Sequence, residues 1–309
     1  MNLNTQTHTI DAIRLWTALV TPFDRKGAID YASLKINAEY QNNAGNGILL
    51  LGSTGEGLAL TKEEQLSVVT FITSMALDVP IMVAVGGYNL SEQLEWIAIC
   101  NKLPISAYLL GTPIYTKPGP VGQTQWFSAL LEQSDFPCML YNVPSRSAVS
   151  IPVTTVKELQ HHRNCWALKE ASGELTSFLA FKQHCPEIKL FSGEDAMMPY
   201  LAGADVAGLV SVASNVWPEA THMYVNLALS GRHQGLFPLW QNAVDALFQV
   251  SSPIPVKVLM AQKSMISTAT LRAPLTDQEL AANNELVEVD QLINQWLIAQ
   301  SKQIIGVQS

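Results

Sequence analysis

The stretch Cys165-Trp166-Ala167-Leu168-Lys169-Glu170-Ala171-Ser172-Gly173 contains the pattern that decides the fold, a short apolar run that ends abruptly in polar sequence with a glycine. Such a run predicts a buried strand followed by a loop. Similar runs recur along the chain between amphipathic stretches, an alternation typical of repeated βα units around a parallel sheet. We predict eight strands: Leu15–Val20, Gly47–Leu51, Pro80–Val85, Ala107–Leu110, Cys138–Asn142, Cys165–Lys169, Lys189–Ser192 and Gly208–Val212.

Eight strands, each followed by a helix, close most naturally into a (β/α)8 TIM barrel, for which about 250 residues is typical. Helix start signals lie between the predicted strands. Thr61 with Glu64 three residues on forms a capping box, and Ser91 begins a further amphipathic stretch. We therefore expect an α/β barrel over residues 1–230.

The rest of the chain, residues 231–309, is predicted to form C-terminal helices that pack on the barrel. Thr276 with Glu279 is a second capping box, at which we expect the last helix to begin. That helix has an apolar stripe of Ile293, Trp296 and Leu297, suited to burial against the barrel or a partner subunit. Because no Pro-, Gly- or Ser-rich linker precedes the tail, a separate domain is not expected.

Composition narrows the class of protein. The chain has 309 residues, 48% hydrophobic and 14% charged, and a net charge of −8, which argues against a nucleic-acid partner. The first ten residues show no secretion signal, and no apolar run reaches about 18 residues, so no membrane association is expected. The cysteines lack metal-type spacing and are interpreted as buried, reduced thiols: Cys100, Cys138, Cys165 and Cys185. We expect a cytoplasmic enzyme without a metal site.

Lys169 stands where its strand meets the loop, an unusual position for a lysine. Burial there disfavours the charged form of the side chain. An uncharged amine can attack the carbonyl of a keto acid or an aldehyde and form an imine. The alternative is a lysine whose stem packs on the barrel while its ammonium group reaches solvent.

In a barrel of this kind the chemistry lies at the C-terminal ends of the strands. The second strand ends in Gly52-Ser53-Thr54-Gly55-Glu56-Gly57, where the backbone N–H groups of Ser53 and Thr54 can converge on a carboxylate. A plain glycine turn is the alternative. No phosphate-binding motif is present, so a nucleotide is not expected.

The fifth strand ends in Tyr141-Asn142-Val143-Pro144-Ser145-Arg146. Tyr141 can pass protons to a reacting group, and the guanidinium of Arg146 suits a substrate carboxylate. A hydrogen-bonded core tyrosine and a surface arginine are the alternatives. Tyr115 lies in a proline-rich loop after the fourth strand. It is interpreted either as a site residue or as a lid residue that packs on the barrel. The pair Glu194-Asp195 is interpreted as a helix N-terminus.

Three motifs stand at strand ends in this order along the chain: Gly52 to Glu56, Tyr141 to Arg146, and Lys169 to Gly173. With them the chain resembles the pyruvate-dependent Schiff-base lyase family, which includes dihydrodipicolinate synthase, N-acetylneuraminate lyase and keto-deoxy-sugar-acid aldolases. The resemblance covers Leu15 to the C-terminus. It implies that Lys169 forms an imine with pyruvate, that no cofactor is needed, and that Tyr141 shuttles protons. Thr54 and Tyr115 would complete the proton relay, with Tyr115 supplied by a neighbouring subunit of a homotetramer.

The resemblance also implies a substrate-binding set. Ser53 and Thr54 would hold the pyruvate carboxylate, Arg146 would bind the carboxylate of L-aspartate 4-semialdehyde, and Gly193 and Val210 complete the set. The segment around Arg146 is similar to that of the synthase branch, in which the two substrates condense to 4-hydroxy-tetrahydrodipicolinate for lysine and diaminopimelate biosynthesis. A sialic-acid or keto-deoxy-sugar-acid lyase and a catalytically silent paralogue stay open as alternatives.

The chain departs from the usual synthase pattern at several positions. Ser53 replaces a threonine, Ser147-Ala148 replaces threonine-glycine, and Ile114 replaces a tyrosine. In lysine-inhibited relatives the feedback site lies near the loop after the third strand, to which Tyr88 and Asn89 could belong. Because Gln65 and Gln93 replace the histidine and glutamate of sensitive enzymes, we expect reduced inhibition by lysine.

Overall fold

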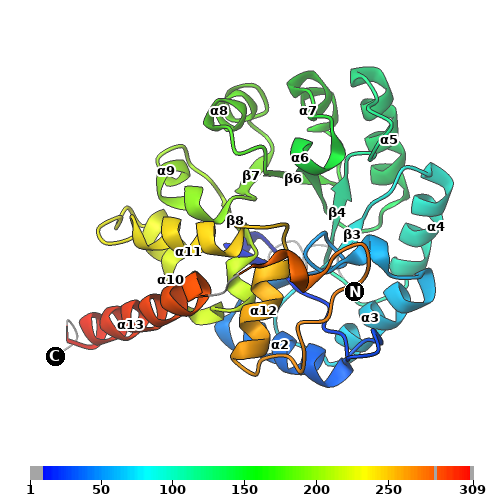
Figure 1. The fold of residues 1–309 in the computed structure, drawn as a ribbon. Helices are drawn as coiled ribbons and strands as arrows, with labels where there is room; N and C mark the ends of the chain where they lie inside the picture. Colours follow the sequence, from blue (N-terminus) through cyan, green and yellow to red (C-terminus); the bar gives the residue numbers. More distant parts are fainter. Residues whose placement is uncertain (1–9, 282–283, 307–309) are drawn as a thin grey trace.

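The computed structural model describes residues 10–281 and 284–306, and its strands form a closed, all-parallel barrel in the order β1 to β8 (Figure 1). The predicted TIM barrel is confirmed, and each strand boundary lies within two residues of its predicted position. The strands are β1 (Leu15–Ala18), β2 (Gly47–Leu50), β3 (Ile81–Val85), β4 (Ala107–Gly111), β5 (Cys138–Asn142), β6 (Cys165–Glu170), β7 (Lys189–Ser192) and β8 (Gly208–Ser211).

Helices follow the strands and surround the barrel (Figure 1). They are α2 (Tyr31–Ala44), α3 (Lys62–Ser74), α4 (Leu90–Cys100), α5 (Pro120–Gln133), α6 (Pro144–Ser147), α7 (Val153–Leu159), α8 (Leu175–His184), α9 (Met198–Ala202) and α10 (Pro218–Leu229). The C-terminal segment adds α11 (Leu239–Leu247), α12 (Ile254–Gln262) and α13 (Asn284–Gly306). Short 3-10 turns are η1 (Gly57–Ala59), η2 (Asp195–Met197), η3 (Ala213–Asn215) and η4 (Asp277–Glu279).

The helix starts agree with the sequence in one case and differ in another. At α3 the capping box is complete, because the Thr61 hydroxyl accepts from the Glu64 N–H while the Glu64 carboxylate accepts from the Thr61 N–H. The predicted start of the next helix at Ser91 is wrong. Asn89 caps α4 instead, since its side-chain oxygen accepts from the Glu92 N–H, and an asparagine fills that position as well as a serine.

The predicted start of the last helix is also wrong. Thr276 caps the short turn η4, and the chain then becomes extended at Leu280, so α13 begins only at Asn284. The apolar stripe of α13 does pack on the rest of the chain. Ile293 is fully buried, and the Trp296 ring lies 5.4 Å from that of Trp240 in α11.

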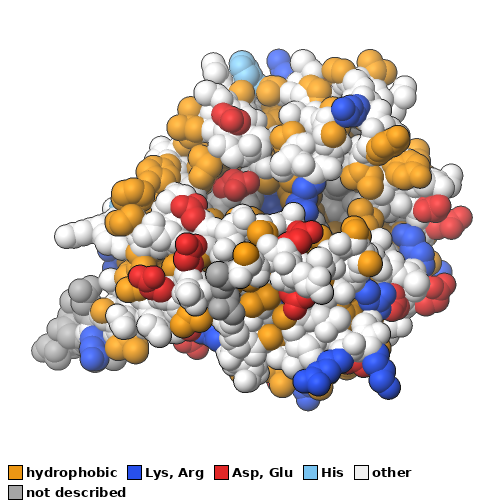
Figure 2. All heavy atoms as spheres, viewed as in Figure 1, with side chains coloured by type: hydrophobic (Ala, Val, Ile, Leu, Met, Phe, Trp, Pro, Cys, Tyr) orange, Lys and Arg blue, Asp and Glu red, His pale blue; other side chains and the backbone are white. Residues whose placement is uncertain are grey.

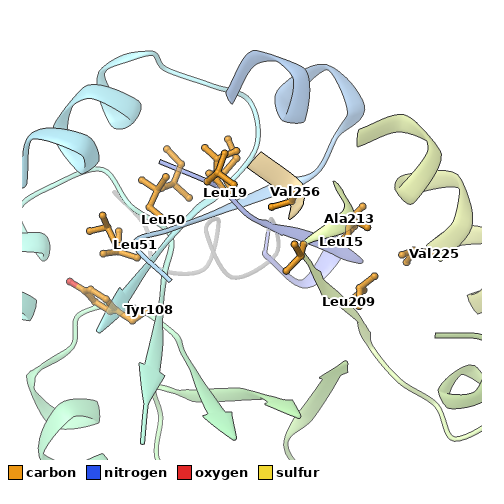
Figure 3. Packing of buried hydrophobic residues seen from close by; sticks show 14 of the residues in the cluster. Leu15, Leu19, Leu50, Leu51, Tyr108, Leu209, Ala213, Val225 and Val256 are labelled. Carbon is orange, nitrogen blue, oxygen red and sulfur yellow. The ribbon is translucent and has the colours of Figure 1, made fainter. Parts of the chain in front are cut away.

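Side chains of the strands alternate between two cores. One core fills the barrel and includes Met139 and Ala167, and the other lies between the strands and the helices. Figure 3 shows the second core around β1, β2 and β8, with Val256 of α12 among its members. Because alternate residues of a strand face the same side, Tyr141 and Lys169 point inward at the C-terminal end of the barrel.

The remaining predictions concern the surface and the thiols. The four cysteines are buried and free, as expected. Acidic and basic side chains are interspersed over the face shown in Figure 2. Within the described residues, no helix has the length and apolar character needed to cross a membrane. The expectation of no secretion signal falls mainly on residues 1–9, which lie outside the described residues.

Candidate active site

A cavity of about 500 Å³ opens at the C-terminal end of the barrel. Its volume is in the range of small-molecule sites. Six of the eight predicted site residues line it, namely Ser53, Thr54, Tyr141, Arg146, Lys169 and Gly193. They come from the ends of β2, β5, β6 and β7 and from the loops that follow, so the barrel brings together residues far apart in the sequence.

Lys169 is buried, with 6% of its surface exposed, and its Nζ lies 4.4 Å from the centroid of the Tyr141 ring. The two residues are direct neighbours in the register of β5 and β6. The position gives the amine access to the cavity while most of the side chain is shielded from solvent. The alternative interpretation, a lysine that reaches bulk solvent, does not hold.

The turn after β2 is fixed by close backbone contacts. The N–H of Gly57 donates to the Gly52 carbonyl at 3.2 Å, and the Thr21 hydroxyl donates to the Gly55 carbonyl at 2.7 Å. A Cβ on Gly57 would lie 2.0 Å from the Leu51 carbonyl oxygen, so only glycine fits there. The turn therefore presents Thr54 in one defined conformation at the wall of the cavity.

A second pair of residues joins the ends of β5 and β6. Asn142 donates to Glu170 Oε2 at 2.6 Å, and Glu170 Oε1 accepts from the Ser172 N–H at 2.8 Å. These residues directly follow Tyr141 and Lys169 in the chain, so their hydrogen bonds hold Tyr141 and Lys169 at a fixed spacing. Sequence analysis missed this link, although both polar residues stand at strand ends.

The acidic pair after β7 has more than the predicted role of starting a helix. Asp195 does begin η2, and its buried carboxylate accepts from the Ser211 hydroxyl and, at 3.0 Å, from the Val212 N–H. Glu194 lines the cavity. Burial raises the pKa of Glu194, the charge of Asp195 adds to this, and the charge of Lys169 opposes it. In the sequence, the position of Glu194 directly after Gly193 was the signal that could have identified it as a residue of the cavity.

Arg146 lies at the rim of the cavity and is exposed. Its Nη2 donates to the carbonyl of Ser252 at 3.2 Å. Ser252 precedes α12, so the C-terminal segment holds the guanidinium group beside the cavity. Arg146 is thus a surface residue, as in the alternative, and its side chain is anchored beside the cavity.

Two predicted site residues lie elsewhere. Val210 is buried in the core that fills the barrel, and Val212, two residues further on, lines the cavity instead. Tyr115 is 86% exposed, has a positive φ of 68°, and is not among the residues that line the cavity. Within this chain, Tyr115 therefore does not line the cavity that Lys169 lines.

The fold and the site together define a class, the barrel enzymes that carry a shielded amine at the end of the sixth strand beside a tyrosine on the fifth. Comparison with known proteins narrows this class. The model of the dihydrodipicolinate synthetase family matches residues 11–293, and the chain belongs to that family.

The similar proteins bear the same enzyme name, and the match covers nearly the whole length of each. A 4-hydroxy-tetrahydrodipicolinate synthase of Francisella philomiragia is 46% identical over 286 residues, which cover 92% of this chain and 96% of the relative. The corresponding enzyme of Wolbachia pipientis is 44% identical, over 91% and 96% of the two chains. The solved structure of the synthase from Methylacidiphilum fumariolicum SolV has a TM-score of 0.86 at 27% identity and covers 94% of this chain and 98% of its own.

Proposed function

We propose that this chain condenses pyruvate with L-aspartate 4-semialdehyde to form 4-hydroxy-tetrahydrodipicolinate, a step toward lysine and diaminopimelate. The observation that carries the proposal is the buried Lys169 amine, which lies 4.4 Å from the Tyr141 ring in a cavity with Arg146 at its rim. Membership of the dihydrodipicolinate synthetase family supports it. So do the relatives that bear the name of this enzyme.

The chemistry begins at Lys169. Its amine attacks C2 of pyruvate, and loss of one water leaves a protonated imine. The imine draws electrons from the methyl group, which loses a proton and becomes an enamine. The enamine carbon forms a bond to the aldehyde carbon of the second substrate, whose amine then attacks C2, closes the ring and releases Lys169. This sequence needs no cofactor, because the imine itself is the electron sink.

Tyr141 and Thr54 move the protons in this scheme. Both line the cavity with Lys169, and the Tyr141 side chain is in contact with the amine. The backbone N–H groups of Ser53 and Thr54 hold the pyruvate carboxylate, which suits a turn with a fixed conformation. Gly193 leaves room for the lysine stem. Val210 supports the site from the core below the cavity.

Arg146 binds the carboxylate of the aldehyde. The hydrogen bond to Ser252 orients the guanidinium group, and an oriented guanidinium can bind a carboxylate through two parallel hydrogen bonds. Replacement by alanine should raise the KM of the aldehyde while the KM of pyruvate changes little.

Tyr115 completes the proton relay of a neighbouring subunit. Its exposure and its place outside the cavity of its own chain fit this role. The protein then acts as a homotetramer, and we place it in the cytoplasm without a nucleic-acid or membrane partner. Sedimentation of the purified protein tests the tetramer, and loss of activity on dilution to monomers is expected.

The decisive experiment combines trapping with turnover. Borohydride with pyruvate should reduce an adduct on Lys169, located by peptide mass spectrometry, and aspartate semialdehyde should then be consumed by untreated enzyme. Lys169→Ala should lose both. Lys182→Ala, which breaks a partly exposed pair with Asp205, is the matched lysine control and should keep both. If an adduct forms without turnover, aspartate semialdehyde is not the second substrate. If no adduct forms, the Schiff-base mechanism is rejected.

We also propose reduced inhibition by lysine. The Gln65 side chain donates to the carbonyls of Gly57 and Leu60. Its amide NH2 is therefore engaged by the loop after β2 and is not available to a bound lysine. Gln93 is buried. A titration with lysine at subsaturating pyruvate measures the effect, and strong inhibition at low lysine concentration would contradict the expectation.

A further inference from the structure

A buried ion pair joins the C-terminal segment to the turn after β2. Lys257 of α12 is 0% exposed, and its Nζ lies 2.6 Å from Oε1 of Glu56. Glu56 directly follows Gly55 of the turn, and its Oε2 accepts from the backbone N–H of Arg272 at 2.7 Å. Both carboxylate oxygens are therefore held by residues that lie outside the βα repeats.

Lys257 also holds the loop after β1. Its Nζ donates to the Thr21 carbonyl at 2.9 Å and lies 4.2 Å from the centroid of the Phe23 ring. The Thr21 hydroxyl in turn donates to the Gly55 carbonyl at 2.7 Å. Helix α12, the turn after β2 and the loop after β1 thus meet at the Lys257 ammonium group. Both α12, through Lys257, and the loop after β1, through Thr21, form hydrogen bonds with the turn.

Breaking the ion pair between Lys257 and Glu56 is expected to cost much free energy, because both charges are buried. A buried charge is stable only with a partner, and removal of one member of such a pair leaves the other uncompensated. Burial lowers the pKa of Lys257 to about 8, and the charge of Glu56 opposes that effect. Because the carboxylate cannot move away from Lys257 without this penalty, the backbone at Glu56 is held in place. Thr54 lies only two residues before it.

We propose that Lys257 and Glu56 are positioning residues for pyruvate, because their ion pair orients the N–H groups of Ser53 and Thr54 that receive the pyruvate carboxylate. This inference rests on the proposed function, since it specifies how that function's pyruvate site is held. A pair with a purely stabilising role would change the free energy of unfolding and leave the affinity for pyruvate unchanged.

The test replaces Lys257 by methionine, which has a similar length and no charge. Trapping with borohydride over a range of pyruvate concentrations measures half-saturation, and steady-state assays measure the KM of each substrate. In Lys257→Met, half-saturation by pyruvate should rise about 10- to 100-fold, the effect expected when one hydrogen bond to a charged ligand group is lost. The KM of the aldehyde should stay within about twofold, because the ion pair does not contact Arg146.

A matched control comes from the end of the same helix. Lys263 caps the C-terminus of α12 and pairs with Asp290 of α13, away from the turn. Lys263→Met should lower the urea midpoint without a change in half-saturation by pyruvate. Equal pyruvate affinity in Lys257→Met and the wild type, or a parallel rise in both KM values, overturns the inference.

If Lys257→Met does not fold, Glu56→Gln provides the same comparison. The amide oxygen can still accept from the Arg272 N–H, and the amide NH2 then faces Lys257, so both the charge and the acceptor that Lys257 meets are removed. Its half-saturation by pyruvate should also rise, and an unchanged value overturns the inference. The wild type separates the two proposals: if it forms no pyruvate adduct, the proposed function fails, whereas an adduct with unchanged variants rejects the positioning role alone.

Discussion

Gly193 offers a sharp test of how Lys169 is placed. A Cβ at this position would lie 2.5 Å from the Ala171 Cβ and 2.7 Å from Cε of Lys169. Carbon atoms in contact prefer about 3.5 to 4.0 Å, so Gly193→Ala must displace the strand end or the lysine stem by roughly 1 Å. The Lys169 stem is the more flexible neighbour, and its movement would change the position of the amine relative to the Tyr141 ring.

The expected magnitudes follow from this overlap. Overpacking of a well-packed region costs about 1–3 kcal/mol, so the free energy of unfolding should fall by that amount. A displacement of about 1 Å at a reacting group lowers the rate about 100-fold, so kcat/KM for pyruvate should fall by roughly two orders of magnitude. The assays are urea unfolding followed by tryptophan fluorescence, the initial rate of condensation, and the rate of borohydride-trapped adduct formation.

A glycine in an uncrowded position is the control. A Cβ on Gly203 would have the Tyr200 carbonyl oxygen as its nearest neighbour, at 3.8 Å, and φ there is −67°. Gly203→Ala should therefore keep wild-type activity. Wild-type rates of adduct formation in Gly193→Ala would refute the reasoning, and so would a loss of activity no larger than the fraction of unfolded protein.

Three further predictions concern a proton donor, an ion pair and the thiols. Tyr141→Phe keeps the ring against the lysine, so adduct formation should persist while kcat falls about 10²- to 10⁴-fold in the condensation assay. The hydrogen bond from Arg272 lowers the pKa of Glu64, so this carboxylate stabilises the fold above its ordinary pKa of 4.5 and the contribution is lost as pH falls. The difference in unfolding free energy between wild type and Glu64→Gln should accordingly be present at pH 7 and vanish in acid, and a constant difference would contradict it. Burial raises the pKa of three thiols to about 12, so native protein at pH 8 should resist iodoacetamide at Cys100, Cys138 and Cys165 by mass spectrometry, whereas unfolded protein should react.

The strands could be predicted because their signal is local. A strand buried on both faces is an uninterrupted apolar run, and in a parallel barrel each run ends at the same rim. This rule predicts that Lys169, Tyr141 and the turn with Thr54 lie around one cavity, and all three line it. Val210 was implied by the resemblance and not by this rule: it lies inside β8 in the core of the barrel, and Val212, just beyond the strand end at Ser211, lines the cavity.

The helix starts show the limit of a local signal. Thr61 and Thr276 are both followed by glutamate at the third position, yet only the first begins an α-helix. After Thr61 the chain continues into residues that bury a face against the barrel. After Thr276 the chain forms only the short turn η4 and becomes extended at Leu280. Tertiary packing therefore decides whether a capping box is used.

The ion pair of Lys257 and Glu56 could not be found from the sequence for a related reason. Glu56 stands in a motif that already had an interpretation, and Lys257 stands among apolar residues that predict only a buried helix face. Neither position indicates a partner 201 residues away. The βα repeats set where reactive groups lie, since each strand ends at the same rim. The C-terminal segment has no such rule, and it contacts the site through long-range hydrogen bonds: the Lys257 side chain donates to Glu56 of the turn, and the Ser252 backbone carbonyl accepts from Arg146. The proposed positioning role therefore predicts that Lys257, a residue outside the barrel repeats, affects how tightly pyruvate binds.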